Sequence, residues 1–337
     1  MKYTISEYLC SMPLLTGGEW DAKLIEKVME SLHNGETHYV EVPGHPDLRS
    51  QIGEYLSSAG IANRGQVLVT AGIQEARFLS VQVLGKAMGK IVFPGVIHPG
   101  VRAAAEVGNL DYVFIEVGTD HRMLASPAAI KNALSNEGKI LYLESPSRLT
   151  GQYYEKEELN EILSLCREHD VSVILDSGLQ ALIDKPGDSP ASSVETDNTN
   201  IVIGEAWPGS GIDELYIGYI IASEEIVKKI SVQKQAISIC TSAPSQNGAI
   251  VAGREYRQKH PQIINTFKKR RFELESILIK LGANIISSPA VNFVICEDDP
   301  GLQEKLDAAE VRYIDSIYFG KPGYIQLPVT TEIKKVQ

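Results

Sequence analysis

Two places in this sequence carry residues whose type and position suit the binding of a charged ligand. A short apolar run ends at Gly72, and a helical pattern opens at once with Ile73 and Gln74. Free backbone N–H groups at a helix start, together with the positive end of the helix dipole, form a site for an anion. A second apolar run ends at Asp176. The carboxyl end of a buried strand is where α/β folds place their ligands.

Three further segments combine turn residues with side chains that could bind or stack on a ligand. Tyr39 opens the segment 39–49, whose Pro-Gly turn leads into a helix. By itself this pattern is equally typical of a tight turn. His98 follows the apolar run 90–93 and precedes a proline, and a lone histidine of this kind is often a hydrogen-bonded loop residue. Arg148 lies in a loop that is rich in serine, proline and glycine.

The elements that must position these residues alternate between strand and helix through the first two thirds of the chain. Seven runs are apolar almost throughout, which indicates a sheet covered on both faces. The alternation itself indicates parallel βαβ units. The predicted strands are 67–70, 90–93, 112–117, 140–143, 171–175, 200–203 and 216–222, and the predicted helices between them include 74–87, 99–107, 128–135 and 156–169.

We therefore expect an α/β protein with two domains. The larger domain covers residues 36–240 and contains a mostly parallel seven-stranded sheet. The smaller α+β domain combines residues 1–35 and 241–337, with a long helical stretch near 245–281. The basic cluster 268–271 lies in that stretch and is predicted to be a solvated helix face.

Taken in order, these five segments resemble the landmarks of the class I and II aminotransferases, which are fold-type I enzymes that use pyridoxal phosphate (PLP). With continuations near Gln246 and in 320–327, the match extends over nearly the whole chain. The resemblance implies the PLP-transferase fold, a small-molecule site in the cleft between the domains, and a homodimer. In that family Tyr39 would reach the cofactor phosphate of the partner subunit.

The same resemblance implies a role for each remaining candidate. The turn formed by Gly72, Ile73 and Gln74 would bind the PLP phosphate, and Asp176 would contact the pyridine nitrogen. A carboxylate there keeps the pyridine protonated, which makes PLP an electron sink.

Two further roles concern the ring of the cofactor. His98 is the best candidate for the aromatic residue that stacks on it, with Val96 as the alternative if one gap is allowed. Arg148 stands where the asparagine of the family donates to the phenolic oxygen of PLP.

The resemblance breaks at the residue on which transamination depends. Counting back from Gly218 places Pro208 at the position of the Schiff-base lysine, and the sequence has no lysine between Lys185 and Lys228. In the family that lysine amine holds PLP as an imine and then moves the substrate proton. A proline can do neither.

The predicted substrate pocket also lacks the charged contacts of the family. Glu205 and Trp207 stand at hydroxyl positions of the phosphate cup, Tyr216 replaces its arginine, and Gln326 replaces the arginine that binds the substrate carboxylate. The first three supply no positive charge for charge-assisted bonds to phosphate. A neutral amide is a weak replacement for a guanidinium fork. We assign these four residues and Pro208 to the pocket, and assign no catalytic residue.

Three hypotheses follow. The first is a non-transaminating small-molecule-binding or divergent-chemistry homologue, which holds PLP without a covalent bond or does not hold it. The alternative is an active PLP-dependent aminotransferase that uses another base, with Lys228, Lys229 and Lys234 as candidates on a predicted surface helix. The third is a structural role beside an active paralogue in a mixed dimer.

Composition excludes several other classes. Of 337 residues, 32 are basic and 43 acidic, which gives a net charge of −11 and argues against nucleic acid or membrane surfaces as partners. The four cysteines show no Cys-x-x-Cys spacing, so we expect reduced thiols and no metal site. No basic and apolar leader or long apolar run is present, so we expect a cytoplasmic protein.

Overall fold

A computed structural model describes residues 2–4, 6–7, 22–35, 38–57, 66–135, 138–184, 200–211 and 215–330. The larger of its two sheets has seven strands in the order β1-β7-β6-β5-β4-β2-β3. Strand β7 runs antiparallel to both of its neighbours, and the other strand pairs are parallel. The strands are β1 (Val67–Ala71), β2 (Ile91–Pro94), β3 (Tyr112–Ile115), β4 (Ile140–Glu144), β5 (Ser172–Asp176), β6 (Ile201–Glu205) and β7 (Ile217–Ile221).

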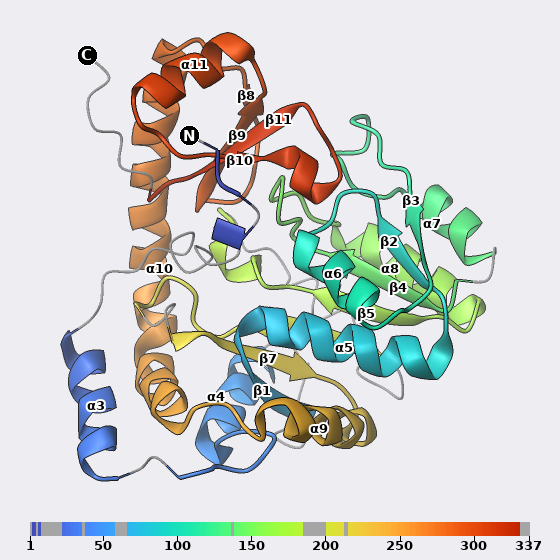
Figure 1. The fold of residues 1–337 in the computed structure, drawn as a ribbon, viewed down its shortest axis with the longest axis vertical. Helices are drawn as coiled ribbons and strands as arrows, with labels where there is room; N and C mark the ends of the chain where they lie inside the picture. The colour runs from blue at the N-terminus through green and yellow to red at the C-terminus, as the bar shows by residue number, and fades with distance from the viewer. Residues whose placement is uncertain are drawn as a thin grey trace.

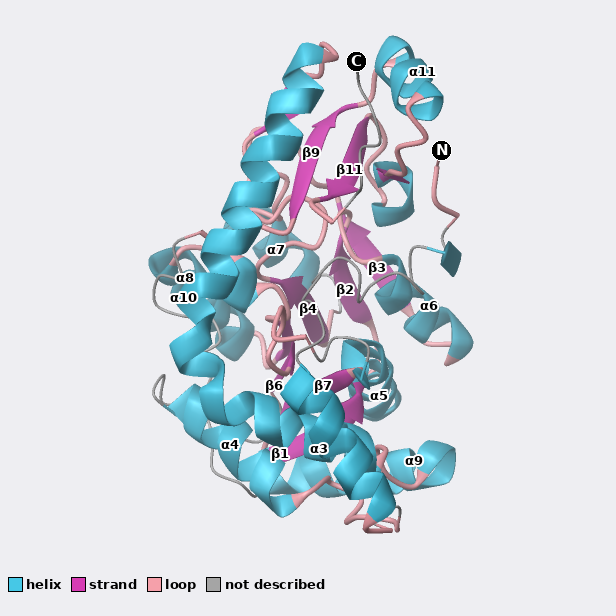
Figure 2. Cartoon of the chain, turned by 90° about the vertical axis from the view of Figure 1, so that its left-hand side faces the viewer, coloured by secondary structure: helices cyan, strands magenta, loops and turns pink. Residues whose placement is uncertain are grey.

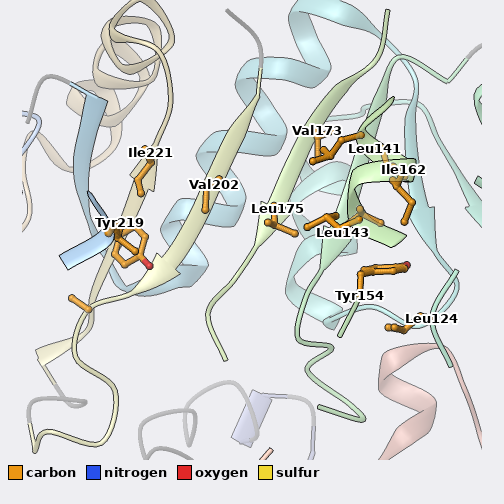
Figure 3. Close-up of a cluster of buried hydrophobic side chains, with 14 of the residues drawn as sticks. Leu124, Leu141, Leu143, Tyr154, Ile162, Val173, Leu175, Val202, Tyr219 and Ile221 are labelled. Atoms are coloured by element: carbon orange, nitrogen blue, oxygen red, sulfur yellow. The ribbon is translucent and has the colours of Figure 1, made fainter. Parts of the chain in front are cut away.

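Helices cover both faces of this sheet because its strands carry apolar side chains on both faces. In β4, Ile140 and Tyr142 point to one face, while Leu141 and Leu143 join the core on the other. Figure 3 shows the second core, in which Leu141 lies beside Val173 of the next strand and Leu143 lies beside Leu175. The first face is covered by α5 (Gly72–Met88), α6 (Pro99–Val107) and α9 (Glu224–Ser238), and the second by α4 (Pro46–Ser57), α7 (Pro127–Leu134), α8 (Lys156–Glu168) and part of α10 (Ala243–Lys280).

The smaller domain is built on a separate antiparallel sheet in the order β10-β11-β9-β8. Helix α10 runs the length of the molecule and passes both sheets (Figures 1 and 2). Helix α3 (Ala22–His33) packs on α10 at the end near α4. The strands and the α-helix that complete this domain are β8 (Ile285–Ile286), β9 (Phe293–Glu297), α11 (Pro300–Ala308), β10 (Ile314–Asp315) and β11 (Tyr324–Pro328).

The expected α/β architecture, with a mostly parallel seven-stranded sheet and a smaller α+β domain, is confirmed. The domain limits at 35, 36, 240 and 241 stay a prediction.

The predicted solvated face at 268–271 differs from the structure at one residue. Arg271 is not simply solvated, because its guanidinium donates to the carbonyls of Ser288 and Ala290. Within the described parts of the chain, no helix combines the length and apolar character needed to cross a membrane.

Candidate functional site

Three adjacent parallel strands each end in a carboxylate at the same edge of the large sheet. Glu144 ends β4, Asp176 ends β5 and Glu205 ends β6. The register pairs Glu144 directly with Asp176. Like charges placed this close in a protein interior need cations beside them or must take up protons. Two arginines supply most of that compensation.

Arg77 of α5 reaches across to Asp176. Its Nε and Nη2 atoms lie 2.9 and 2.8 Å from Oδ2 of Asp176, and both side chains are completely buried. Tyr142 donates its hydroxyl to the same oxygen at 3.0 Å, and Gly178 donates its N–H to Oδ1 at 3.0 Å. Burial opposes ionisation of Asp176, but Arg77 and Arg148 outweigh it and hold its pKa below the ordinary value. Asp176 is therefore a carboxylate with both oxygens engaged.

Arg148 provides the second cation. Its Nη2 lies 2.8 Å from Oε1 of Glu205 and 3.8 Å from Oδ1 of Asp176. The guanidinium also packs against Gly178, where an added Cβ would lie 1.9 Å from Nη2. Burial would lower the pKa of Arg148, but Glu205 and Asp176 raise it, so Arg148 stays charged although it is 4% exposed.

Glu144 supports the two loops that follow β2 and β4. Its Oε1 accepts the N–H of His98 at 2.7 Å, and its Oε2 accepts the N–H of Arg148 at 3.0 Å. Burial and the charge of Asp176 raise the pKa of Glu144 to about 7, although Arg77 and the two N–H donors act in the opposite direction. The third carboxylate therefore takes up a proton near neutral pH.

His98 contacts the buried charged cluster, which consists of Arg77, Glu144, Arg148, Asp176 and Glu205. Its Nδ1 accepts a hydrogen bond from the N–H of Gly100 at 3.1 Å, and this bond caps α6. The same Nδ1 atom lies 3.1 Å from Nη1 of Arg77. Burial, then the charges of Arg77 and Arg148, hold the pKa of His98 well below its usual value. The imidazole is therefore neutral, with Nδ1 as the acceptor. Val96, the alternative candidate, is buried in the apolar core.

The turn at Gly72 has the predicted strand–glycine–helix form. Gly72 has a φ of +70°, and β7 passes so closely that a Cβ on Gly218 would lie 2.6 Å from the carbonyl carbon of Gly72. Gln74 donates its amide to the carbonyl of Gly100 and so ties α5 to α6. The side chain of Ile73 is buried and points toward Gly178. The side chains of the predicted phosphate turn thus serve packing within the fold.

The residues that follow β6 form an aromatic cluster. Trp207 has a φ of +55° and is buried against Tyr55 and Tyr256, with ring centroids 5.3 and 5.4 Å apart. Tyr256 donates its hydroxyl to the carbonyl of Pro208 at 3.0 Å. Tyr216 is 45% exposed and lies beside Gly72. Pro208 is therefore held by its backbone and offers no amine.

Gln326 and Tyr39 lie in different surroundings. The Gln326 amide donates to the carbonyls of Arg148 and Leu149 at 2.9 and 2.8 Å, so it braces the loop rather than presenting its N–H groups to a ligand. Tyr39 is 77% exposed and lines a separate pocket of about 500 Å³ near α3 and α10. That pocket contains none of the buried cluster residues. The single chain thus does not bring Tyr39 to the cluster.

The predicted lysine candidates require one correction. Lys228 and Lys229 are exposed on α9 as expected, but Lys234 is completely buried. Its amine lies 2.9 and 2.7 Å from the two carboxylate oxygens of Glu75. Glu75 also accepts the N–H of Ala71, so the pair ties α9 to the first turn of α5. The surface prediction for Lys234 was wrong because one charged residue on the inner side of a helix can be stabilised by a distant partner.

The sequence interpretation also missed Arg77, Tyr142 and Glu144. Arg77 is a charged residue among the buried positions of α5, and such a residue needs a buried partner of opposite charge. Asp176, at the end of a buried strand, is the natural partner for it. Glu144 follows the apolar run of β4 just as Asp176 follows that of β5, so the same rule could have identified it.

Comparison with known proteins identifies the family of this chain. The family of class I and II aminotransferases matches residues 14–325, and the chain belongs to it. A probable aspartate/prephenate aminotransferase of Aquifex aeolicus is 26% identical over 325 residues, which cover 90% of this chain and 81% of the relative. An aspartate aminotransferase of Bacillus subtilis is 22% identical and covers 92% and 84% respectively.

Solved structures agree with this fold. An aspartate aminotransferase from Thermus thermophilus with maleate superimposes with a TM-score of 0.85 at 20% identity, covering 98% of this chain and 94% of that one. An aromatic aminotransferase from Pyrococcus horikoshii gives a TM-score of 0.83 at 21% identity, covering 98% and 95%. At these identities the likeness shows the shared fold.

The family implies PLP as its cofactor, but the residues present do not fit PLP in the position that the resemblance implies. Both oxygens of Asp176 already accept hydrogen bonds from the chain itself. Arg148 lies between Asp176 and Glu205. His98, Asp176 and Arg148 are each at most 4% exposed, so almost no water-sized space borders these side chains.

Proposed function

We propose that this chain is a non-transaminating member of the class I and II aminotransferase family, which acts as a small-molecule-binding or regulatory homologue. The observation that supports this most strongly is the composition of the buried charged cluster. Among the described residues, the cations that contact Asp176 and Glu205 are Arg77 and Arg148, and no lysine contacts either carboxylate.

Transamination needs a group that forms an imine with PLP and then carries a proton at the substrate Cα. A guanidinium forms no such imine and stays protonated at working pH. Pro208 lacks an amine, and the amine of Lys234 is bound by Glu75. His98 uses Nδ1 to accept from Gly100 and faces Arg77. The groups near the strand ends therefore serve to hold each other in place.

The proposal also covers assembly and location. Members of the family are typically homodimers, and we propose the same for this chain. The high exposure of Tyr39 supports this, because the family role of that tyrosine requires a partner subunit. We propose a cytoplasmic protein that does not hold PLP covalently.

The test is proton exchange at the Cα of amino acids. The protein is incubated with PLP and with aspartate, glutamate or an aromatic amino acid in D2O, and the Cα–H signal is followed by NMR. An active aspartate aminotransferase is the positive control, and PLP alone gives the background rate. We expect exchange at the background rate. Exchange that rises in proportion to protein concentration would refute the proposal.

A further inference from the structure

The Arg148 guanidinium lies close to two residues that the family resemblance assigns to the cofactor. Its Nη2 approaches Glu205, at the expected phosphate cup, to 2.8 Å and Asp176, the expected partner of the pyridine nitrogen, to 3.8 Å. A planar, delocalised cation of the chain therefore faces the carboxylate that a pyridinium would face. Guanidinium groups are suited to this, because they are flat, always charged and weakly hydrated.

The backbone on both sides of Arg148 is fixed. Its N–H donates to Glu144 at 3.0 Å, and its carbonyl accepts from Gln326 at 2.9 Å. The guanidinium rests on Gly178, whose missing Cβ leaves the room that Nη2 occupies. With 4% exposure, Arg148 has little freedom to swing out into solvent. The side chain is thus a built part of the site.

We propose that Arg148 is a tethered occupant of the inherited cofactor site, and that removing it opens the site to planar heteroaromatic cations without phosphate. This inference rests on the proposed function and explains why the inherited site does not hold the cofactor. Without Arg148, Glu205 loses its cation and Asp176 keeps one, Arg77. The vacated space then carries an uncompensated negative charge. That charge attracts a pyridinium and repels a phosphate dianion.

The experiment is calorimetric titration of the full chain with pyridoxamine, pyridoxamine phosphate and inorganic phosphate as separate ligands. Arg148→Ala removes the guanidinium. Gly178→Ala keeps Arg148 but places a methyl group where Nη2 lies, so the guanidinium must move. The matched control is Arg122→Ala, which removes an arginine bound to Glu158 outside the cluster. Circular dichroism confirms that each variant is folded.

We expect no measurable binding by the wild type or the Arg122 variant. Arg148→Ala should bind pyridoxamine at least about tenfold more tightly than the weakest affinity that the titration detects, which corresponds to about 1.4 kcal/mol. It should prefer pyridoxamine to pyridoxamine phosphate, and adding Glu205→Ser should reduce that preference. Gly178→Ala should bind pyridoxamine more weakly than Arg148→Ala but more tightly than the wild type. If Arg148→Ala fails to fold, the affinity of Gly178→Ala for pyridoxamine tests the inference instead.

Two results would overturn the inference. One is a wild-type protein that binds pyridoxamine as tightly as Arg148→Ala does. The other is that every folded variant among Arg148→Ala and Gly178→Ala binds no better than the wild type. Either result leaves the proposed lack of transamination intact, because that is measured separately by Cα exchange in the unmodified protein.

Discussion

Replacing Arg77 by methionine should destabilise the protein strongly, because it strands a buried carboxylate. Arg77 and Asp176 both have fully buried side chains, and two N–H groups of Arg77 lie 2.9 and 2.8 Å from one oxygen. Removing one member of a buried ion pair typically costs about 3–5 kcal/mol. Arg148 remains 3.8 Å from the other oxygen and compensates part of the charge. We therefore expect a loss near the lower limit, about 3 kcal/mol.

A double-mutant cycle measured by urea unfolding separates pairing from general damage. Arg77→Met, Asp176→Asn and the double variant are compared, with unchanged m-values as the sign of unchanged native and denatured states. The double variant should lose clearly less than the sum of the singles, with a coupling of about 2 kcal/mol. The control pair Lys259–Glu255 lies on α10, with N and O atoms 2.9 Å apart and side chains 47% and 51% exposed. Lys259→Met should therefore cost less than about 1 kcal/mol.

The reasoning is refuted if Arg77→Met costs no more than Lys259→Met, or if the two single losses at Arg77 and Asp176 add without coupling. Either outcome would mean that a cation other than Arg77 neutralises the charge of Asp176.

Three further predictions concern other parts of the molecule. Burial and the charge of Asp176 raise the pKa of Glu144 to about 7 from 4.5. The folded protein therefore keeps a proton that the unfolded chain releases between those pH values, and the free energy of unfolding should fall as pH rises through this window. Glu144→Gln should flatten that fall in urea titrations, and an unchanged pH slope would contradict the assignment. Burial raises the pKa of the Cys166 and Cys296 thiols to about 12, so native protein should leave both unlabelled by iodoacetamide, and labelling should require denaturant. Finally, α3 exposes an apolar face that includes Met29 at 46%. Met29→Glu should weaken the proposed homodimer in light scattering, and an unchanged dimer would show that this face lies outside the interface.

Most of the fold could be predicted from local patterns. The seven strands of the large sheet lie within a few residues of the predicted runs, because strands buried on both faces leave a continuous apolar signal. The ends of the apolar runs also predict the ends of the strands, so Asp176 and the turn at Gly72 lie at strand ends as expected. These features depend on short stretches of sequence.

The partners of these residues could not be predicted in the same way. Arg77 and Asp176 lie 99 positions apart, and Lys234 and Glu75 lie 159 apart. No local pattern joins them, since each pair forms only when the helices pack on the sheet. Gln326 looked like a ligand contact because it aligned with a family arginine, but a shorter amide can also serve the backbone. In this structure its amide donates to the carbonyls of Arg148 and Leu149.

The central claim is that no side chain of this protein forms a lasting covalent bond to PLP. The direct measurement is peptide-level mass spectrometry after incubation with PLP, removal of excess PLP by gel filtration, and reduction with borohydride. We predict that no lysine, including Lys228, Lys229 and Lys234, carries a pyridoxyl group at a yield approaching one per chain. A single lysine modified at that yield would contradict the account.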